Sequence, residues 1–189
     1  MFSGYRPAYL RALHVLAEAS LRLKQAGVAR PVLVGGAAVE FYSAAAFVSG
    51  DFDLVIPDQA ALEAVLCEIG FERPDDGTRG LQHVALNIAV EVVGRALLDG
   101  MGAMDRVVAI TVAPGLPLLF IGCEDLIADR VAQADAGRHL DQDRFAQAAV
   151  LYRMLGDRLD RSYLDQQIRQ QAAGRTLAWF EGEVNARLG

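Results

Sequence analysis

The sequence predicts an α/β (α+β) fold, in which a mixed sheet of four or five strands is flanked by helices and followed by a helical C-terminal part. Two short apolar runs, 32–34 and 54–56, have the length of buried strands, and the Ala-rich segment 37–46 between them has the composition of a short helix. From Glu124 onward the pattern is helical. We therefore expect an α/β core over residues 1–122 and a helical region over residues 123–189 that packs on this core.

Length and composition restrict the class of protein. The chain has 189 residues, of which 53% are hydrophobic and 22% charged, so it can bury a real core and is globular rather than disordered. No apolar run approaches the roughly 20 residues of a membrane-spanning helix, and the N-terminus lacks the pattern of a signal peptide. The two cysteines, Cys67 and Cys123, do not make a disulfide framework. We expect a cytoplasmic protein without a membrane partner.

The net charge of −6 argues against a general nucleic-acid-binding protein, because such proteins normally carry a basic face. Lys24 is the only lysine of the sequence, so nearly all positive charge belongs to arginine. A phosphate group that is bound here by a side-chain cation is therefore expected to be bound by arginine, through a bidentate fork.

Two segments of the first half have the spacing of amphipathic helices. The first spans residues 7–27, with Gly27 at the C-terminal cap position, and we expect it to cover the sheet. Asp58 is a suitable N-cap for the second, which extends to Ile69. The apolar residues that recur at helical spacing in the first helix are Leu10, Leu13, Leu16, Ala17 and Leu21.

The middle of the chain alternates between polar and apolar stretches. Residues 72–80 are polar and rich in turn-forming residues, which predicts an exposed loop. Residues 81–86 and 88–93 are apolar and form either a hairpin or one long bent strand. Residues 107–112 are expected as a further strand, and the short apolar run 118–121 as an edge strand.

Four helices are predicted after Gly122, which is the best boundary between the core and the helical part. Glu124 and Asp125 lie in the first turn of the first of them, where acidic side chains suit the helix dipole. The four expected ranges are 124–136, 140–155, 160–173 and 176–188.

The segment 31–56 carries the residues with the clearest chemical pattern. Gly35 and Gly36 directly follow the first strand, where the chain must turn sharply and where a missing Cβ allows another group to approach the backbone. Asp51 and Asp53 stand two positions apart at the start of the next strand, so we expect their carboxylates on the same side. Two carboxylates on one face suit Mg²⁺, which completes its coordination with phosphate and water.

Glu91 is an acidic residue in the middle of the apolar run 88–93. It needs a partner there, because an isolated buried charge is very costly. A metal ion shared with Asp51 and Asp53 would supply the partner; the alternative is a position on the exposed face of an edge strand. His83, on the preceding strand, is either a half-buried, hydrogen-bonded histidine or a catalytic residue.

The order of an apolar strand, a Gly-Gly pair, a helix and then Asp51-Phe52-Asp53 on the next strand resembles the nucleotidyltransferase superfamily, which has the DNA polymerase β-like fold. Within it, the chain is most similar to small bacterial members related to abortive-infection and toxin–antitoxin nucleotidyltransferases. The resemblance implies Mg²⁺-dependent transfer of a nucleoside monophosphate from an NTP such as ATP. It also implies that Asp51, Asp53 and Glu91 are catalytic and bind metal, with two Mg²⁺ ions when the NTP is bound.

The same resemblance implies that Gly35, Gly36 and Ser49 bind the β- and γ-phosphates of the nucleotide at a helix N-terminus. Related proteins carry a basic residue, often lysine, on a helix after the core, and Arg130 is the nearest match here. Arg130 and Gln133 are three residues apart and share a helix face. The alternative interpretation of this helix is an exposed helix with surface salt bridges.

The residues allow three functional hypotheses. The first is nucleotidyl transfer to an acceptor that could be a tRNA, a protein, a small molecule such as an antibiotic with a hydroxyl group, or another nucleotide. The second is a catalytically inactive nucleotidyltransferase-like binding protein, such as one member of a toxin–antitoxin pair with a cognate protein partner; the missing lysine and the acidic net charge motivate it. The third is a nucleotide-binding α/β domain without transfer chemistry, in which Asp51 and Asp53 lie apart from Glu91.

Overall fold

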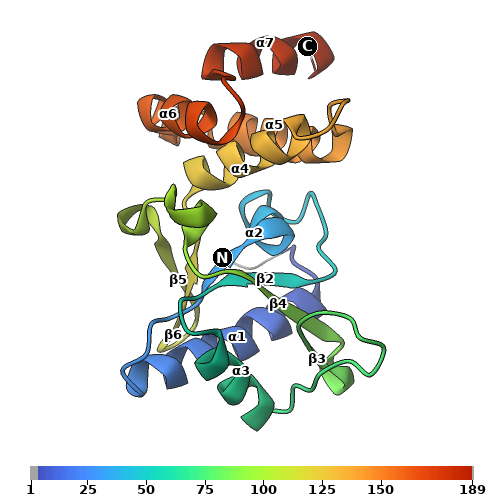
Figure 1. Cartoon of the computed structure of the whole chain (residues 1–189), viewed down its shortest axis with the longest axis vertical. Coiled ribbons are helices and arrows are strands. Elements are labelled where there is room, and N and C mark those ends of the chain that lie inside the picture. Colours follow the sequence, from blue (N-terminus) through green and yellow to red (C-terminus); the bar gives the residue numbers. More distant parts are fainter. Residues whose placement is uncertain (1–3, 189) are drawn as a thin grey trace. The chain divides into compact units, whose positions relative to one another are not determined.

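A computed structural model describes residues 4–188 of the chain (Figure 1). The chain divides into two compact units. The first contains Met1–Asp99 and Met104–Ile121, and the second contains Gly100–Ala103 and Gly122–Gly189. The sequence placed the boundary one residue later and did not assign the short segment Gly100–Ala103 to the helical part.

The first unit contains a six-stranded mixed sheet, which confirms the predicted fold class and has at least one strand more than expected. The order across the sheet is β3-β4-β2-β1-β6-β5. Strand β1 is antiparallel to β2 and parallel to β6, and β2 is parallel to β4. The strands are β1 (Val32–Val34), β2 (Phe52–Val55), β3 (Leu81–His83), β4 (Ile88–Gly94), β5 (Val108–Ala113) and β6 (Leu116–Phe120).

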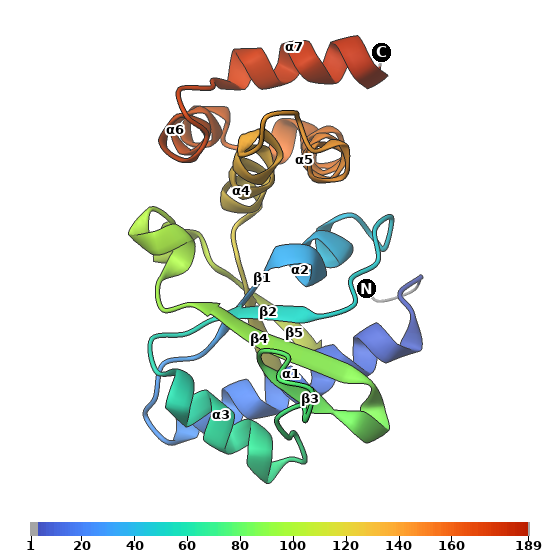
Figure 2. The ribbon, with the colours of Figure 1, turned by 45° about the vertical axis from the view of Figure 1, so that its right-hand side comes forward.

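Three α-helices belong to this unit: α1 (Pro7–Gln25), α2 (Gly35–Tyr42) and α3 (Gln59–Glu68). Helices α1 and α3 lie next to each other below the sheet in Figure 2. The predicted N-cap of α3 is confirmed, because the Asp58 carboxylate accepts a hydrogen bond of 3.0 Å from the amide of Ala61.

Helix α2 differs from its expected range of 37–46. It begins directly at the glycine pair, and it ends at Tyr42. The chain cannot continue as a helix beyond this point, because Ala44 and Ala45 adopt positive φ angles of +51° and +66°. The loop that leads from α2 to β2 therefore starts earlier than the Ala-rich composition suggested.

The alternation of side chains along β2 separates its apolar residues from its acidic one. Phe52 and Leu54 are buried, and the ring of Phe52 stacks on that of Tyr9 from α1 at a centroid distance of 5.7 Å. Because successive side chains of a strand point to opposite faces, Asp53 lies on the face of the sheet that points away from Tyr9. This face carries the candidate site.

The two antiparallel hairpins answer one question that the sequence left open and correct one prediction. Strands β3 and β4 form a hairpin rather than one bent strand, and Asn87 turns the chain with a left-handed backbone conformation. The run expected as an edge strand was placed wrongly, because β6 lies between β1 and β5. Its residues Leu118 and Phe120 are fully buried.

The second unit contains the four predicted helices within a few residues of their expected bounds. They begin with capping residues in two cases, since the carboxylates of Asp141 and Asp160 accept hydrogen bonds from amides of the first turn. None of the helices within residues 4–188 is long and apolar enough to cross a bilayer. The helices are α4 (Cys123–Asp135), α5 (Gln142–Leu155), α6 (Arg161–Gln171) and α7 (Leu177–Leu188).

Candidate functional site

Two acidic residues lie side by side on neighbouring strands at the centre of the candidate site. Strands β2 and β4 are parallel, and Asp53 is the register partner of Glu91. Register partners on adjacent strands point to the same face, and neighbouring strands lie about 4.8 Å apart. Both side chains are half-buried. Glu91 therefore stands next to Asp53, on the face of the sheet that points away from Tyr9.

The first glycine of α2 lies against the carboxylate of Asp53. Gly35 has a φ of +64°, a conformation that favours glycine. A Cβ built at this position would be 1.9 Å from Oδ2 of Asp53, so no other residue fits without moving the carboxylate. The first turn of α2 thus begins beside Asp53, with its amide groups at the positive end of the helix dipole.

The second glycine makes room for Ser49. A Cβ at Gly36 would be 2.7 Å from the Ser49 Oγ. The hydroxyl of Ser49 donates a hydrogen bond of 2.9 Å to the backbone carbonyl of Asp51, and it lies 3.4 Å from Oδ1 of the same residue. The predicted phosphate-binding residues Gly35, Gly36 and Ser49 therefore lie close to Asp51, the first of the two aspartates.

Asp51 itself lies just before β2, and its side chain is exposed. Within residues 4–188, no group of three His, Cys, Asp or Glu side chains is arranged to hold a metal ion. The structure thus pairs Asp53 with Glu91 through the sheet, whereas Asp51 belongs to the adjoining loop. Two carboxylates are compatible with Mg²⁺, because this ion commonly binds one or two carboxylates together with phosphate oxygens and water.

Sequence reasoning missed a buried ion pair beside the site. Glu40 of α2 is 0% exposed, and both of its carboxylate oxygens accept hydrogen bonds of 2.9 Å from Arg6. The amide of Ser49 donates to Oε2 of Glu40 at 2.8 Å, and Arg6 also donates to the carbonyl oxygen of Ser49. The hydrogen bond with Glu40 raises the pKa of Arg6. The argument applied to Glu91, an acid within an apolar segment, would have found Glu40 as well.

Two tyrosines of the N-terminal segment also contact α2. The hydroxyl of Tyr9 donates to the carbonyl of Ala37 at 2.7 Å, and that of Tyr5 donates to the carbonyl of Phe41 at 2.6 Å. Burial raises the pKa of Tyr9, which keeps its hydroxyl protonated and able to donate. The start of α1 therefore fixes the position of α2, and with it the glycine turn.

His83 lies on the opposite face from the acidic pair. It is the register partner of Ile88, which is two positions before Val90 on the buried side of β4. The ring packs edge-on against Phe71 at a centroid distance of 5.3 Å. Its buried Nδ1 has no hydrogen-bond partner among the described residues. This position fits a packing role better than a catalytic one.

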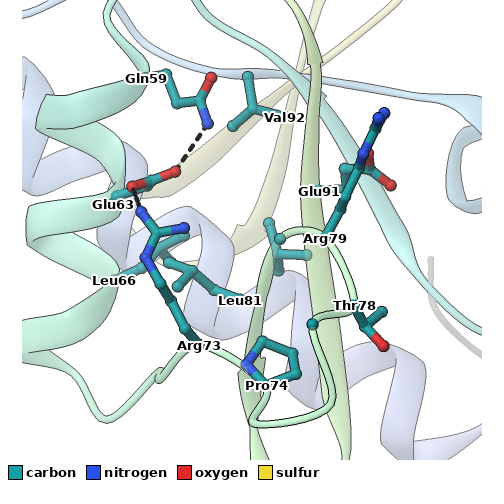
Figure 3. Close-up of a pocket in the computed structure, with 13 residues that line it drawn as sticks. Gln59, Glu63, Leu66, Arg73, Pro74, Thr78, Arg79, Leu81, Glu91 and Val92 are labelled. Carbon is teal, nitrogen blue, oxygen red and sulfur yellow. Dashed lines mark hydrogen bonds and ion pairs between the residues drawn. The ribbon is translucent and has the colours of Figure 1, made fainter.

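A cavity of about 470 Å³ adjoins Glu91 at the edge of β4 (Figure 3). Its walls are Glu91 and Val92, residues of α3, and the loop that the sequence predicted at 72–80. Gly80 fixes this loop against the strand, because it has a φ of +87° and a Cβ there would be 2.2 Å from the carbonyl oxygen of Val90. The loop is thus anchored directly beside Glu91.

The charged side chains of this cavity differ in how they are held. Arg73 pairs with Glu63 at 2.5 Å, and Gln59 donates to the same carboxylate at 2.7 Å. Arg79 and Glu91 extend in the same direction, away from α3 (Figure 3). The cavity therefore lies on the side of β4 that faces α3, and the Glu91 side chain extends away from that side.

Arg130 belongs to α4 in the second unit, whereas the other predicted site residues belong to the first unit. Its guanidinium pairs with the Asp129 carboxylate at 2.6 Å, and the amide of Gln133 donates to the same carboxylate at 3.0 Å. The side chain of Arg130 is only 4% exposed. It is therefore not a solvated surface residue, and its role in nucleotide binding stays a prediction.

Comparison with known proteins identifies the fold. No protein-family model matches the sequence, and no curated protein matches it. Among solved structures, the chain is similar to an antigenic nucleotidyltransferase-like protein from Paracoccidioides brasiliensis, with 14% identity, a TM-score of 0.56, and coverage of 94% of this chain and 92% of the other.

It is also similar to ANT(2'')-Ia in complex with adenylyl-2''-tobramycin, with 15% identity, a TM-score of 0.54, and coverage of 92% and 97%. A solution structure of the antibiotic-resistance factor ANT(2'')-Ia gives 16% identity, a TM-score of 0.53, and coverage of 94% and 93%. The chain therefore has a nucleotidyltransferase-like fold, as the sequence predicted. The narrower resemblance to abortive-infection and toxin–antitoxin proteins stays a prediction.

Proposed function

We propose that this protein is a nucleotidyltransferase that transfers a nucleoside monophosphate from an NTP to an acceptor in the presence of Mg²⁺. The observation that carries the proposal is the register pairing of Asp53 with Glu91, directly behind the turn at Gly35. The nucleotidyltransferase-like fold supports it. A pair of carboxylates beside a helix N-terminus suits a triphosphate with its metal ion, because the two binding elements attract opposite charges.

Mg²⁺ fits the donors at this position, since carboxylate oxygens are hard ligands. Asp53 and Glu91 would hold it from the sheet, and Asp51 is available from the exposed end of the loop. When bound, Mg²⁺ neutralises negative charge on the triphosphate and at the reacting phosphorus.

The glycine turn would bind the phosphates of the nucleotide. The amides of Gly35 and Gly36 lie in the first turn of α2, where they have no partner within the helix. Ser49 contributes a hydroxyl beside Gly36. To donate to a phosphate oxygen, this hydroxyl exchanges its bond with the carbonyl of Asp51 for one with the ligand.

The chemistry that these residues would serve is a displacement at the α-phosphorus. The acceptor oxygen forms a bond with this phosphorus, the bond to the bridging oxygen breaks, and pyrophosphate leaves. The proton of the acceptor hydroxyl passes to a base, and Glu91 or a water molecule next to it can take it. Glu91 can do so only with an oxygen that does not bind the metal ion.

The first acceptor to test is taken from the similar structures, because the cavity beside Glu91 is walled by α3, Val90 and Val92 on the face of the sheet away from Asp53. One of the similar proteins is bound to adenylyl-2''-tobramycin, an adenylylated antibiotic, which makes tobramycin a reasonable first compound to test.

The test is label transfer from each of the four α-³²P-labelled NTPs. Tobramycin, total tRNA and a small-molecule fraction of a cell extract serve as acceptors, with and without Mg²⁺. The matched variants are Asp53→Asn and, as a control, Glu68→Gln, whose side chain is 68% exposed and pairs with Arg22 of α1 on the other side of the sheet. We expect Mg²⁺-dependent labelling by the wild type and by Glu68→Gln, and none by Asp53→Asn.

The same assay distinguishes an active nucleotidyltransferase from a catalytically inactive binding protein. A catalytically inactive binding protein would bind an NTP without transferring label to any acceptor. Label transfer that is equal in wild type and Asp53→Asn would contradict the proposed site, because the reaction would then not depend on the acidic pair.

A further inference from the structure

We propose that the Arg6–Glu40 ion pair is a positioning element of the candidate site, and that it sets the geometry of the loop that carries Ser49 and Asp51. The inference rests on the proposed function and adds to it two residues that lie outside the nucleotide-binding pattern. Neither residue needs to contact the nucleotide, because both act on the backbone of Ser49.

Glu40 is committed to this role by its surroundings. A carboxylate that is 0% exposed must be paired, since an isolated buried charge is very costly. Arg6 pairs with it through two parallel N–H···O bonds of 2.9 Å, the bidentate geometry that lysine cannot reproduce. The pair joins the residue just before α1 to the middle of α2.

The backbone of Ser49 is held from both sides by this pair. Its amide donates to Glu40 at 2.8 Å, and its carbonyl oxygen accepts from Arg6. The residue is consequently fixed with its hydroxyl over Gly36, and Asp51 follows two positions later. The positions of Ser49, which would bind phosphate, and of Asp51 thus depend on an ion pair between residues that are distant in the sequence.

The loop itself does not favour this path. Ala44 and Ala45 both have positive φ angles, a region in which the Cβ of an L-residue is strained. Such strain persists only where surrounding contacts outweigh it. The Arg6–Glu40 pair supplies contacts at the far end of the loop, just before the chain enters β2 at Phe52.

A purely structural ion pair would stabilise the unit without affecting ligand binding, so the test compares two arginines of the same unit. Arg6→Gln removes the bidentate pair. Arg30→Gln is the matched control, because Arg30 also joins two segments, through Ser20 Oγ at 2.9 Å and the carbonyl of Pro117. Pro117 precedes Leu119, the register partner of Val32, and so lies at the end of the strands away from Gly35. Arg6→Lys keeps the charge and serves if Arg6→Gln does not fold.

Two measurements are made on the full-length variants: hydrogen exchange of the Ser49 amide, and calorimetric affinity for Mg²⁺ with a non-hydrolysable ATP analogue. Arg6→Gln removes the bond to the Ser49 carbonyl and the two bonds that hold Glu40, the acceptor of this amide, so exchange of the amide should speed by about 10- to 100-fold. We expect nucleotide affinity to fall by about tenfold or more, with an intermediate loss in Arg6→Lys and no change in Arg30→Gln.

The outcomes are distinguishable. If the wild type binds the Mg²⁺–nucleotide and Arg6→Gln and Arg6→Lys bind it with the affinity of the wild type, the positioning role is wrong and the proposed function stands. If exchange of the Ser49 amide is unchanged in Arg6→Gln and in Arg6→Lys, the pair does not hold the loop, and the inference is also overturned. If the wild type does not bind the nucleotide at all, the proposed function fails, whatever the exchange rates are.

Discussion

The carboxylate of Asp53 occupies the space that a side chain at Gly35 would need. A Cβ at Gly35 would lie 1.9 Å from Oδ2 of Asp53, far below any possible contact distance. Gly35 also has a φ of +64°. The turn after β1 and the acid on β2 are therefore packed so closely that no side chain can be added at Gly35 without moving the Asp53 carboxylate.

Substitution Gly35→Ala should consequently remove activity. The added methyl group forces the Asp53 carboxylate out of its position, and we expect a loss of about 100-fold or more in transfer rate. Gly115→Ala is the control, because Gly115 has a similar φ of +77° but nothing within 4 Å of its Cβ position. It should lose stability from backbone strain and keep its activity once folded. Equal activity losses in the two variants would show that strain alone is responsible.

Tyr9→Phe tests whether α1 positions the glycine turn. The change removes the hydrogen bond to the carbonyl of Ala37, in the first turn of α2, and should lower the free energy of unfolding by about 1 kcal/mol. Tyr42→Phe removes a similar bond of 2.8 Å to Ile121 from the last turn of α2. Denaturant titration should give comparable costs, but only Tyr9→Phe should weaken nucleotide binding. Weakening by Tyr42→Phe to the same degree would argue for a general effect of α2.

His83→Phe should leave the transfer reaction intact. His83 lies on the buried face of the hairpin, against Phe71, and not on the face of Asp53 and Glu91. We expect steady-state rates within about threefold of wild type, because the substitution changes packing and not the reacting groups. A loss of about 100-fold in the transfer rate, with the fold intact, would instead indicate that the histidine takes part in the reaction.

The second unit should show acid sensitivity that depends on Asp165. The hydrogen bond from the amide of Leu177, and then the one from Arg169, lower the pKa of Asp165 below its ordinary value of 3.8. A carboxyl group with a lowered pKa stabilises the folded state above its unfolded pKa, and this contribution is lost as the pH falls through the folded pKa.

Asp165→Asn should therefore lower the melting temperature at pH 7, by roughly 2–4 °C for a chain of this size. The difference from wild type should shrink below about pH 4 and vanish once the wild-type carboxyl is protonated. Asp157→Asn is the control, because the side chain of Asp157 is exposed. A difference that persists unchanged at pH 2.5 would contradict the role of the charge.

The core of the candidate site could be predicted because each of its parts leaves a local pattern. A buried strand of three apolar residues, two glycines and alternating acids specify the turn and the face without knowledge of distant contacts. The pairing of Asp53 with Glu91 followed from treating an acid in an apolar strand as one that needs a partner. The number of C-terminal helices was predicted for the same reason, since helical spacing is local.

Features that depend on long-range pairing could not be predicted. The interior position of β6 depends on a parallel pairing with β1 that spans more than 80 residues of sequence, and no local pattern encodes it. The early end of α2 was missed because alanine favours helices in general, whereas Ala44 and Ala45 follow the path that their contacts impose. Arg6 gave no indication at all, because its partner Glu40 is 34 residues away.

The central claim is that Asp53 and Glu91 together bind the metal–nucleotide complex. The most direct test is calorimetric titration of a non-hydrolysable ATP analogue into wild type, Asp53→Asn, Glu91→Gln and the control Glu68→Gln, with and without Mg²⁺. The account predicts binding that requires Mg²⁺, weakened at least about tenfold by either site substitution and unaffected by Glu68→Gln. Binding of equal strength in all four proteins, independent of Mg²⁺, would contradict it.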